Sequence, residues 1–151
     1  MNKKLTISIG CDHGGLELKN YLKDELTKQG ITIIDCGTNT LDSCNYPDFA
    51  FKAAELVKDK KVDYGIVVCT SGEGVSICAN KVKGVRCGLI YNKEVARLVK
   101  EHNNCNMIAF GAKYISKEDA LEDVNIFLNT EFGGNRHATR VGLITAYEEN
   151  N

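Results

Sequence analysis

The sequence lacks an excess of charge of either sign. Its 151 residues include 19 Lys and Arg against 20 Asp and Glu, a formal net charge of −1. This balance gives no general field for nucleic acid or an anionic membrane, so neither partner is expected and an anion must bind locally. No apolar stretch approaches the roughly 20 residues of a membrane span, and Met1–Lys4 leads into a strand-like segment without a signal-peptide core. We therefore expect a cytoplasmic protein.

Paired cysteines are also missing. The chain has an odd number of cysteines and no C-x-x-C pair, and the spacing argues against a zinc site. Because several cysteines lie within or at the ends of apolar runs, we expect most of them to pack as reduced thiols. The seven are Cys11, Cys36, Cys44, Cys69, Cys78, Cys87 and Cys105.

Linkers, repeats and low-complexity segments are absent, and the single proline, Pro47, sits in a polar connection from Asn39 to Asp48. With 43% hydrophobic residues, residues 1–151 suit one compact domain. Short runs rich in Val and Ile, bounded by Gly, Asp or Asn, predict five strands. These are Leu5–Cys11, Ile31–Cys36, Val62–Cys69, Val85–Ile90 and Asn106–Phe110.

Apolar residues at helical spacing recur between these runs. The stripe over Leu16–Leu26 has the 3.6-residue period and precedes Gly30, a common helix stop. Further helices are expected over Phe49–Val57, Val75–Asn80, Val95–Val99, Ala120–Leu128 and Thr139–Glu149. The alternation predicts an α/β fold, a Rossmann-like three-layer α/β/α sandwich with a five-stranded parallel sheet. Ligands of such folds bind beyond the carboxyl ends of the strands.

The segment Cys69–Gly74, with sequence CTSGEG, is the most informative part of the chain. It follows a β-branched run and opens a helix, so its backbone N–H groups and a positive helix end face whatever lies at the strand tip. Here the residue at the tip is a thiol. A helix N-terminus favours the thiolate, which suits a nucleophile or a base.

Two further segments carry candidate site residues. Asp12 and His13 follow the first strand, and His102 and Asn103 precede the fifth. We expect these side chains to converge with Cys69 and its loop at one edge of the sheet. Taken singly, each has a simpler interpretation, since Asp12 could cap the next helix and a lone histidine is often an ordinary surface residue.

A third segment carries positive charge near the C-terminus. Arg136 and Arg140 are spaced i and i+4, so they share one face of a helix, with His137 beside them. Two planar guanidinium groups suit a phosphate dianion. The alternative is a solvated basic turn of a terminal helix.

Together these motifs resemble those of a known family, the B-type ribose-5-phosphate isomerases, from about Ile7 to Tyr147. The wider family includes allose-6-phosphate isomerase and the paired subunits of galactose-6-phosphate isomerase. The resemblance implies a metal-free, cofactor-free aldose-ketose isomerase, a homodimer or homotetramer with active sites shared between subunits. The matching motifs are Gly10–His13, Asp35–Thr38, Tyr46–Pro47, Cys69–Gly74, Ala79–Lys81, His102–Asn103, Ala109–Gly111 and Arg136-His137-x-x-Arg140.

The family chemistry assigns roles to three residues. D-ribose 5-phosphate would become D-ribulose 5-phosphate through an enediolate, with His102 assisting ring opening. Cys69 as thiolate would move the proton from C2 to C1. The Ser71 hydroxyl and the loop N–H groups would stabilise the negative charge of the enediolate.

The resemblance also implies binding residues. His13, Arg136 and Arg140 would hold the phosphate, while His137 would either reach the phosphate of the neighbouring subunit or only support Arg136. The sugar hydroxyls would meet Asp12, Tyr46 and Asn103. The remaining loop residues expected at the substrate are Thr70, Gly72, Glu73 and Gly74.

Three positions depart from the family pattern. The common loop reads Cys-Gly-Thr-Gly-x-Gly, whereas Thr70 and Ser71 stand here, so a β-branched residue follows the base. A second branch uses a Glu where this chain has Val75, which favours Cys69 as the base and leaves Glu73 as its rival. Many relatives have an arginine at Lys113, a point charge that holds phosphate less rigidly.

Other classes of protein fit these residues less well. A cysteine phosphatase needs Cys-x5-Arg, and the sixth residue after Cys69 is Val75. A thiol redox protein needs a second cysteine near Cys69, and Cys78 is expected to face the core. A flavodoxin-like module would leave the histidines and arginines without a role. Within the isomerases, allose 6-phosphate or galactose 6-phosphate is the alternative substrate.

Overall fold

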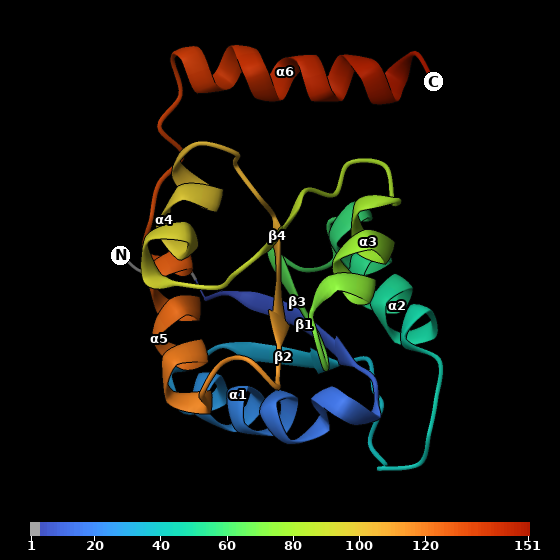
Figure 1. Ribbon diagram of the computed structural model, residues 1–151. Helices are drawn as coiled ribbons and strands as arrows, with labels where there is room; N and C mark the ends of the chain where they lie inside the picture. The colour runs from blue at the N-terminus through green and yellow to red at the C-terminus, as the bar shows by residue number, and fades with distance from the viewer. Residues whose placement is uncertain (1–3) are drawn as a thin grey trace.

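A parallel sheet forms the centre of the computed structural model, which describes residues 4–151 (Figure 1). All five predicted strands are confirmed, with ends shifted by one or two residues. The strands run side by side in the order β2-β1-β3-β5-β4. They are β1 Thr6–Cys11, β2 Thr32–Asp35, β3 Tyr64–Cys69, β4 Cys87–Leu89 and β5 Met107–Gly111.

Helices cover both faces of this sheet, which confirms the three-layer α/β/α sandwich. One face packs against α1 (Leu16–Lys28), α4 (Lys93–Glu101) and α5 (Lys117–Leu128). The other packs against α2 (Tyr46–Lys58) and α3 (Glu73–Asn80). Because β1, β3 and β5 are buried on both faces, their sequences are nearly continuous apolar runs.

Two local features differ from the sequence prediction. The polar connection before the second helix ends earlier than expected, because α2 begins at Tyr46 and Pro47 lies in its first turn, where proline needs no N–H partner. A short 3-10 helix, η1 (His13–Gly15), follows Asp12 and was not predicted.

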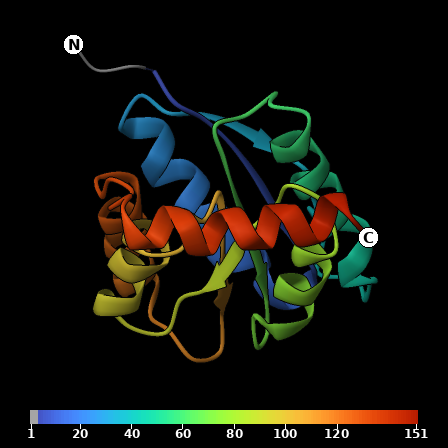
Figure 2. The same cartoon turned by 90° about the horizontal axis from the view of Figure 1, so that it is seen from above.

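Helix α6 (Arg136–Glu149) belongs to neither layer. It stands apart from the other helices in Figure 1 and crosses over the middle of the molecule in Figure 2. Only His137 and Val141 of this helix are buried, whereas Leu143 and Tyr147 are 66% and 71% exposed. No helix within residues 4–151 combines the length and apolar character needed to cross a membrane.

One buried carboxylate in α5 has no hydrogen-bond partner for one of its oxygens. Asp123 is 1% exposed, and among residues 4–151 nothing donates to its Oδ1. Burial, followed by the charges of Asp119 and Glu122, raises the Asp123 pKa from 3.8 to about 6, while Lys93 acts in the opposite direction. The protonated form is therefore favoured in the fold, and the free energy of unfolding falls as pH rises from about 4 to about 6.

Replacing this carboxyl group should stabilise the protein above its pKa. We expect Asp123→Asn to raise the free energy of unfolding by about 1–3 kcal/mol at pH 7.5 and to have little effect at pH 4. Urea unfolding followed by circular dichroism at both pH values measures this. Glu118→Gln, an exposed position in the first turn of the same helix, is the control. Equal effects of Asp123→Asn at both pH values would contradict the assignment.

Candidate active site

The Cys69–Gly74 loop wraps around the Cys69 sulfur at the carboxyl end of β3. Gly72 has φ of +80°, a left-handed conformation that favours glycine, and its N–H donates to Cys69 Sγ at 3.2 Å. The thiol is 5% exposed. The sulfur thus lies at the strand tip, shielded from solvent and in contact with a backbone donor of the loop.

The same loop presents further donors at the start of α3. The Glu73 N–H donates a hydrogen bond to Ser71 Oγ at 3.2 Å. The N–H groups of Ser71 and Gly74 have no acceptor within the described part of the chain. Unpaired N–H groups at and just before the start of a helix are a natural binding site for an anionic oxygen. The Tyr46 ring lies against Gly74, where an added Cβ would come within 2.5 Å of the ring.

Asp12 and His13 lie beside this loop at the end of β1. The Asp12 carboxylate accepts the Gly14 N–H at 3.0 Å, so the capping alternative for Asp12 is confirmed, on η1. His13 Nδ1 accepts the Cys44 N–H at 3.3 Å. A His13 ring that accepts this bond at Nδ1 carries its proton on Nε2, which is then the donor. Sequence reasoning missed Cys44, because a backbone N–H carries no signal in the residue type.

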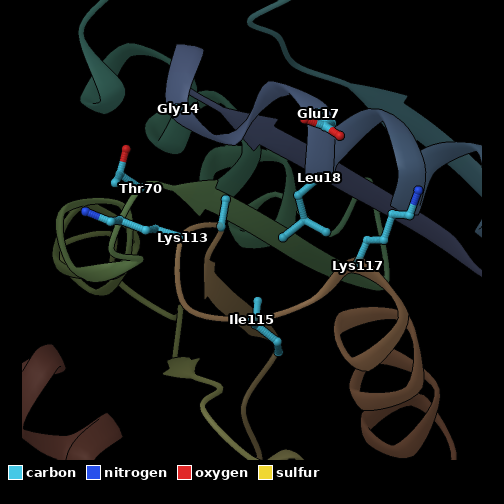
Figure 3. A pocket seen from close by; sticks show the side chains of 8 residues that line it. Gly14, Glu17, Leu18, Thr70, Lys113, Ile115 and Lys117 are labelled. Atoms are coloured by element: carbon cyan, nitrogen blue, oxygen red, sulfur yellow. The ribbon is translucent and has the colours of Figure 1, made fainter.

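A cavity of about 480 Å³ lies next to Thr70 of this loop (Figure 3). Thr70 borders it, and a Cβ at Gly14 would collide with the Thr70 hydroxyl unless that side chain rotated, so the glycine permits this close approach. The Lys113 side chain runs along the cavity toward Thr70 in Figure 3. The sequence indicated Thr70 and Lys113, but it did not indicate five further lining residues, which are Glu17, Leu18, Ala112, Ile115 and Lys117.

His102 and Asn103 lie at the opposite edge of the sheet, which corrects the expected convergence at one edge. His102 follows the last residue of α4, and a helix that leads into a parallel strand ends at the amino edge of that strand. Its ring stacks on His137 at a centroid distance of 4.1 Å and an angle of 13°. Cys69 and its loop therefore form one group of candidate residues, and the histidine pair forms another.

The second group is positively charged. Arg136 and Arg140 are exposed at the start of α6, and within residues 4–151 neither guanidinium has a carboxylate or carbonyl partner. Burial, then the charges of His102, Arg136 and Arg140, lower the His137 pKa from 6.5, while Glu101 acts in the opposite direction. A neutral His137 beside two unpaired arginines forms a surface suited to a phosphate dianion.

The buried thiols other than Cys69 behave as packing residues. All seven cysteines are free, and Cys78 is buried, as expected for a residue facing the core. Burial raises the pKa of Cys11 to about 12 and of Cys105 to about 11, and it also raises the pKa of Cys87. Within the described residues, no group of three or more His, Cys, Asp or Glu side chains is placed to hold a metal ion.

Comparison with known proteins identifies the family. The model of the Ribose/Galactose Isomerase family matches residues 7–144. The chain belongs to this family. Ribose-5-phosphate isomerase B of Escherichia coli is 38% identical over 143 residues, covering 95% of this chain and 96% of that protein.

Solved structures of Ribose/Galactose Isomerase proteins share the fold. Ribose-5-phosphate isomerase B of Clostridium thermocellum superposes with a TM-score of 0.95 at 46% identity, covering 97% of this chain and 99% of that one. The enzyme of Mycoplasma genitalium with bound ribulose-5-phosphate gives a TM-score of 0.94 at 35% identity, covering 99% and 100% of the two chains. The fold of this family member is therefore that of an aldose-ketose isomerase.

The electrostatic link between His137 and its arginines can be measured. We expect Arg136→Gln and Arg140→Gln each to raise the His137 pKa toward 6.5, because each removes a positive charge that disfavours the imidazolium. Proton NMR titration of the three histidines measures this in the assembled protein. Lys58→Gln, an exposed change on α2, should leave the His137 pKa in place. A pKa that moves down in either arginine variant would refute the arrangement.

Proposed function

We propose that this protein interconverts D-ribose 5-phosphate and D-ribulose 5-phosphate, with Cys69 as the base. The observation that carries the proposal is the Cys69 thiol, held by the Gly72 N–H at the strand tip beside unpaired loop donors. The relatives named ribose-5-phosphate isomerase B support the choice of substrate. Residues 1–151 form one sugar-phosphate isomerase domain in this proposal, and the free thiols suit the cytoplasm.

The chemistry follows from the charges in the loop. The Cys69 thiolate removes the C2 proton of the open-chain aldose, and the electrons move to the carbonyl oxygen at C1 to form the enediolate. The unpaired Ser71 and Gly74 N–H groups are the candidate donors to that oxygen. The hydroxyl proton of O2 passes to O1, and the same thiol returns the carbon-bound proton to C1, which completes the ketose with no net gain or loss of a proton.

Glu73, the rival base, is supported less well. It is exposed in the first turn of α3, where its charge interacts with the helix end, whereas the Cys69 sulfur is buried within the loop. A base must also be shielded from water to act on a carbon acid efficiently. These surroundings favour the sulfur.

A second subunit supplies the other half of the site in this proposal. His102, Asn103, Arg136, His137 and Arg140 lie at the edge of the sheet opposite to Cys69, so they reach a Cys69 loop only from another chain. Helix α6 carries exposed Leu143, Ile144 and Tyr147, which suits burial against a second copy. We therefore infer a homodimer or a homotetramer of such pairs.

The phosphate is held from both chains. Nε2–H of His13 and the ammonium of Lys113 approach from the carboxyl edge of one subunit. Arg136 and Arg140, which lack an anionic partner in residues 4–151, approach from the other. His102 of that second subunit faces the sugar, where an imidazole can move the proton that opens the furanose ring.

The first test is turnover and its dependence on the thiol. With ribose 5-phosphate in deuterated buffer containing EDTA, proton NMR should show ribulose 5-phosphate forming. Cys69→Ala should reduce kcat by about 100-fold or more yet still bind the sugar phosphate, because it removes only the base. Glu73→Gln, which tests the rival base, should retain turnover within about threefold.

The outcomes separate substrate from mechanism. Conversion of allose 6-phosphate or galactose 6-phosphate in place of ribose 5-phosphate would refute the substrate while keeping the isomerase chemistry. Near-normal turnover by Cys69→Ala together with a large loss in Glu73→Gln would transfer the role of base to Glu73.

Sharing of the site is tested by mixing two inactive chains. Cys69→Ala and the double variant Arg136→Ala/Arg140→Ala should each be inactive alone. After dissociation and reassembly at equal amounts, half of the pairs are hybrids with one intact site of two, so about a quarter of the wild-type activity should return. If no activity returns although mass spectrometry shows that hybrids have formed, both groups of residues belong to the site of one chain.

A further inference from the structure

Lys19 is a fully buried lysine in α1, on the side of the helix that faces the end of β2. Its exposed fraction is 0%, the value of the most buried core residues. Nζ donates to both Asp35 oxygens at 2.7 and 2.9 Å, to the Thr38 carbonyl at 2.7 Å and to Asn39 Oδ1 at 2.8 Å. A buried ammonium is retained only where its donors are satisfied, and these four acceptors satisfy them.

Two of these acceptors belong to the loop formed by residues 36–45, which joins β2 to α2. Burial alone would raise the Asp35 pKa, but hydrogen bonds from Lys19, Gly37 and Lys23 hold it below its ordinary value. Asp35 is therefore a fixed anion that keeps the ammonium at the start of the loop. The Lys19 contacts to Thr38 and Asn39 then determine where the loop leaves the sheet.

The loop is also bonded to the end of β1. The Cys11 N–H donates to the Gly37 carbonyl at 2.7 Å, and the Thr38 N–H donates to the Cys11 carbonyl at 2.8 Å. Asp12 and His13 follow directly. Farther along the loop, the Cys44 N–H holds His13 Nδ1 at 3.3 Å. The loop thus starts at the buried ammonium and returns to the His13 ring.

We infer that Lys19 is a positioning residue for the phosphate end of the site: by fixing residues 36–45 it holds the Cys44 N–H on His13 Nδ1 and keeps the His13 proton on Nε2. Lys19 touches no substrate in this arrangement. Its effect passes through Thr38, Asn39 and the loop to His13. The kinetic consequence rests on the proposed function, whereas the state of the His13 ring does not.

Lys23 provides a matched control on the same helix. Its Nζ donates to Asp35 Oδ2 at 3.1 Å, but its side chain is 41% exposed. Within residues 4–151 it has no hydrogen bond to the 36–45 loop. Loss of Lys23 therefore removes a charge from Asp35 and leaves the loop contacts of Lys19 in place.

The first experiment observes the His13 ring directly by long-range proton–nitrogen NMR in the intact protein. The wild type and Lys23→Met should show His13 with its proton on Nε2. Lys19→Met should show a mixture of both tautomers, because the loop no longer holds the Cys44 N–H in place. An unchanged Nε2–H tautomer in folded Lys19→Met would overturn the inference, whatever the enzyme's substrate.

The second experiment separates positioning from stability. Lys19→Met leaves Asp35 without its buried partner. The double variant Lys19→Met/Asp35→Asn removes both charges and keeps an acceptor for the Gly37 N–H. The double variant should therefore unfold at a higher urea concentration than Lys19→Met. Both variants should raise KM for the sugar phosphate about tenfold with kcat changed less than about threefold, since phosphate binding weakens while the thiol is untouched. A normal KM in the double variant would show that Lys19 serves stability alone.

Discussion

The parallel direction of all five strands is the constraint on which the site depends. Each strand ends at the same edge, so Asp12, Cys69 and Gly111 meet there, and each returning helix ends at the other edge. His102 ends α4 and is therefore separated from Cys69 by the length of β3, about 16–20 Å for its six residues. No adjustment of loops within one chain closes that gap. The topology that builds the thiol loop also makes each chain half of the proposed site.

Within its own half, the chain relies on backbone more than on side chains. The Cys69 sulfur receives the Gly72 N–H, His13 receives the Cys44 N–H and Asp12 receives the Gly14 N–H. Backbone donors are fixed by the sheet and by helix starts, so they need little reorganisation when charge develops on a ligand. In the inference above, the buried Lys19 supports one of these backbone donors, since its side chain fixes the loop that carries the Cys44 N–H to His13.

The elements of this fold were predictable because their signals are local. Apolar runs gave the strands, and period 3.6 gave the helices, to within a few residues. The edge on which His102 lies was predicted wrongly, although a residue that precedes a strand of a parallel sheet lies at the amino edge whatever the strand order. The roles of the Cys44 N–H and of Lys19 were missed for a different reason. Their contacts arise between segments far apart in sequence, through a backbone N–H and a lysine that composition alone assigns to the surface.

The unusual residue after the proposed base is explained by its neighbours. A β-branched Thr70 in place of glycine would be expected to crowd a substrate beside Cys69, yet its hydroxyl lies against Gly14, in space that any side chain at residue 14 would fill. Thr70 thus borders the 480 Å³ cavity that Lys113 also lines. Thr70 and Lys113, two of the departures from the family pattern, therefore line the same cavity, which Gly14 also borders. In the proposed site, a hydroxyl and a flexible ammonium would together replace the fixed fork of an arginine in holding the phosphate, with the hydroxyl adding the directionality that the point charge lacks.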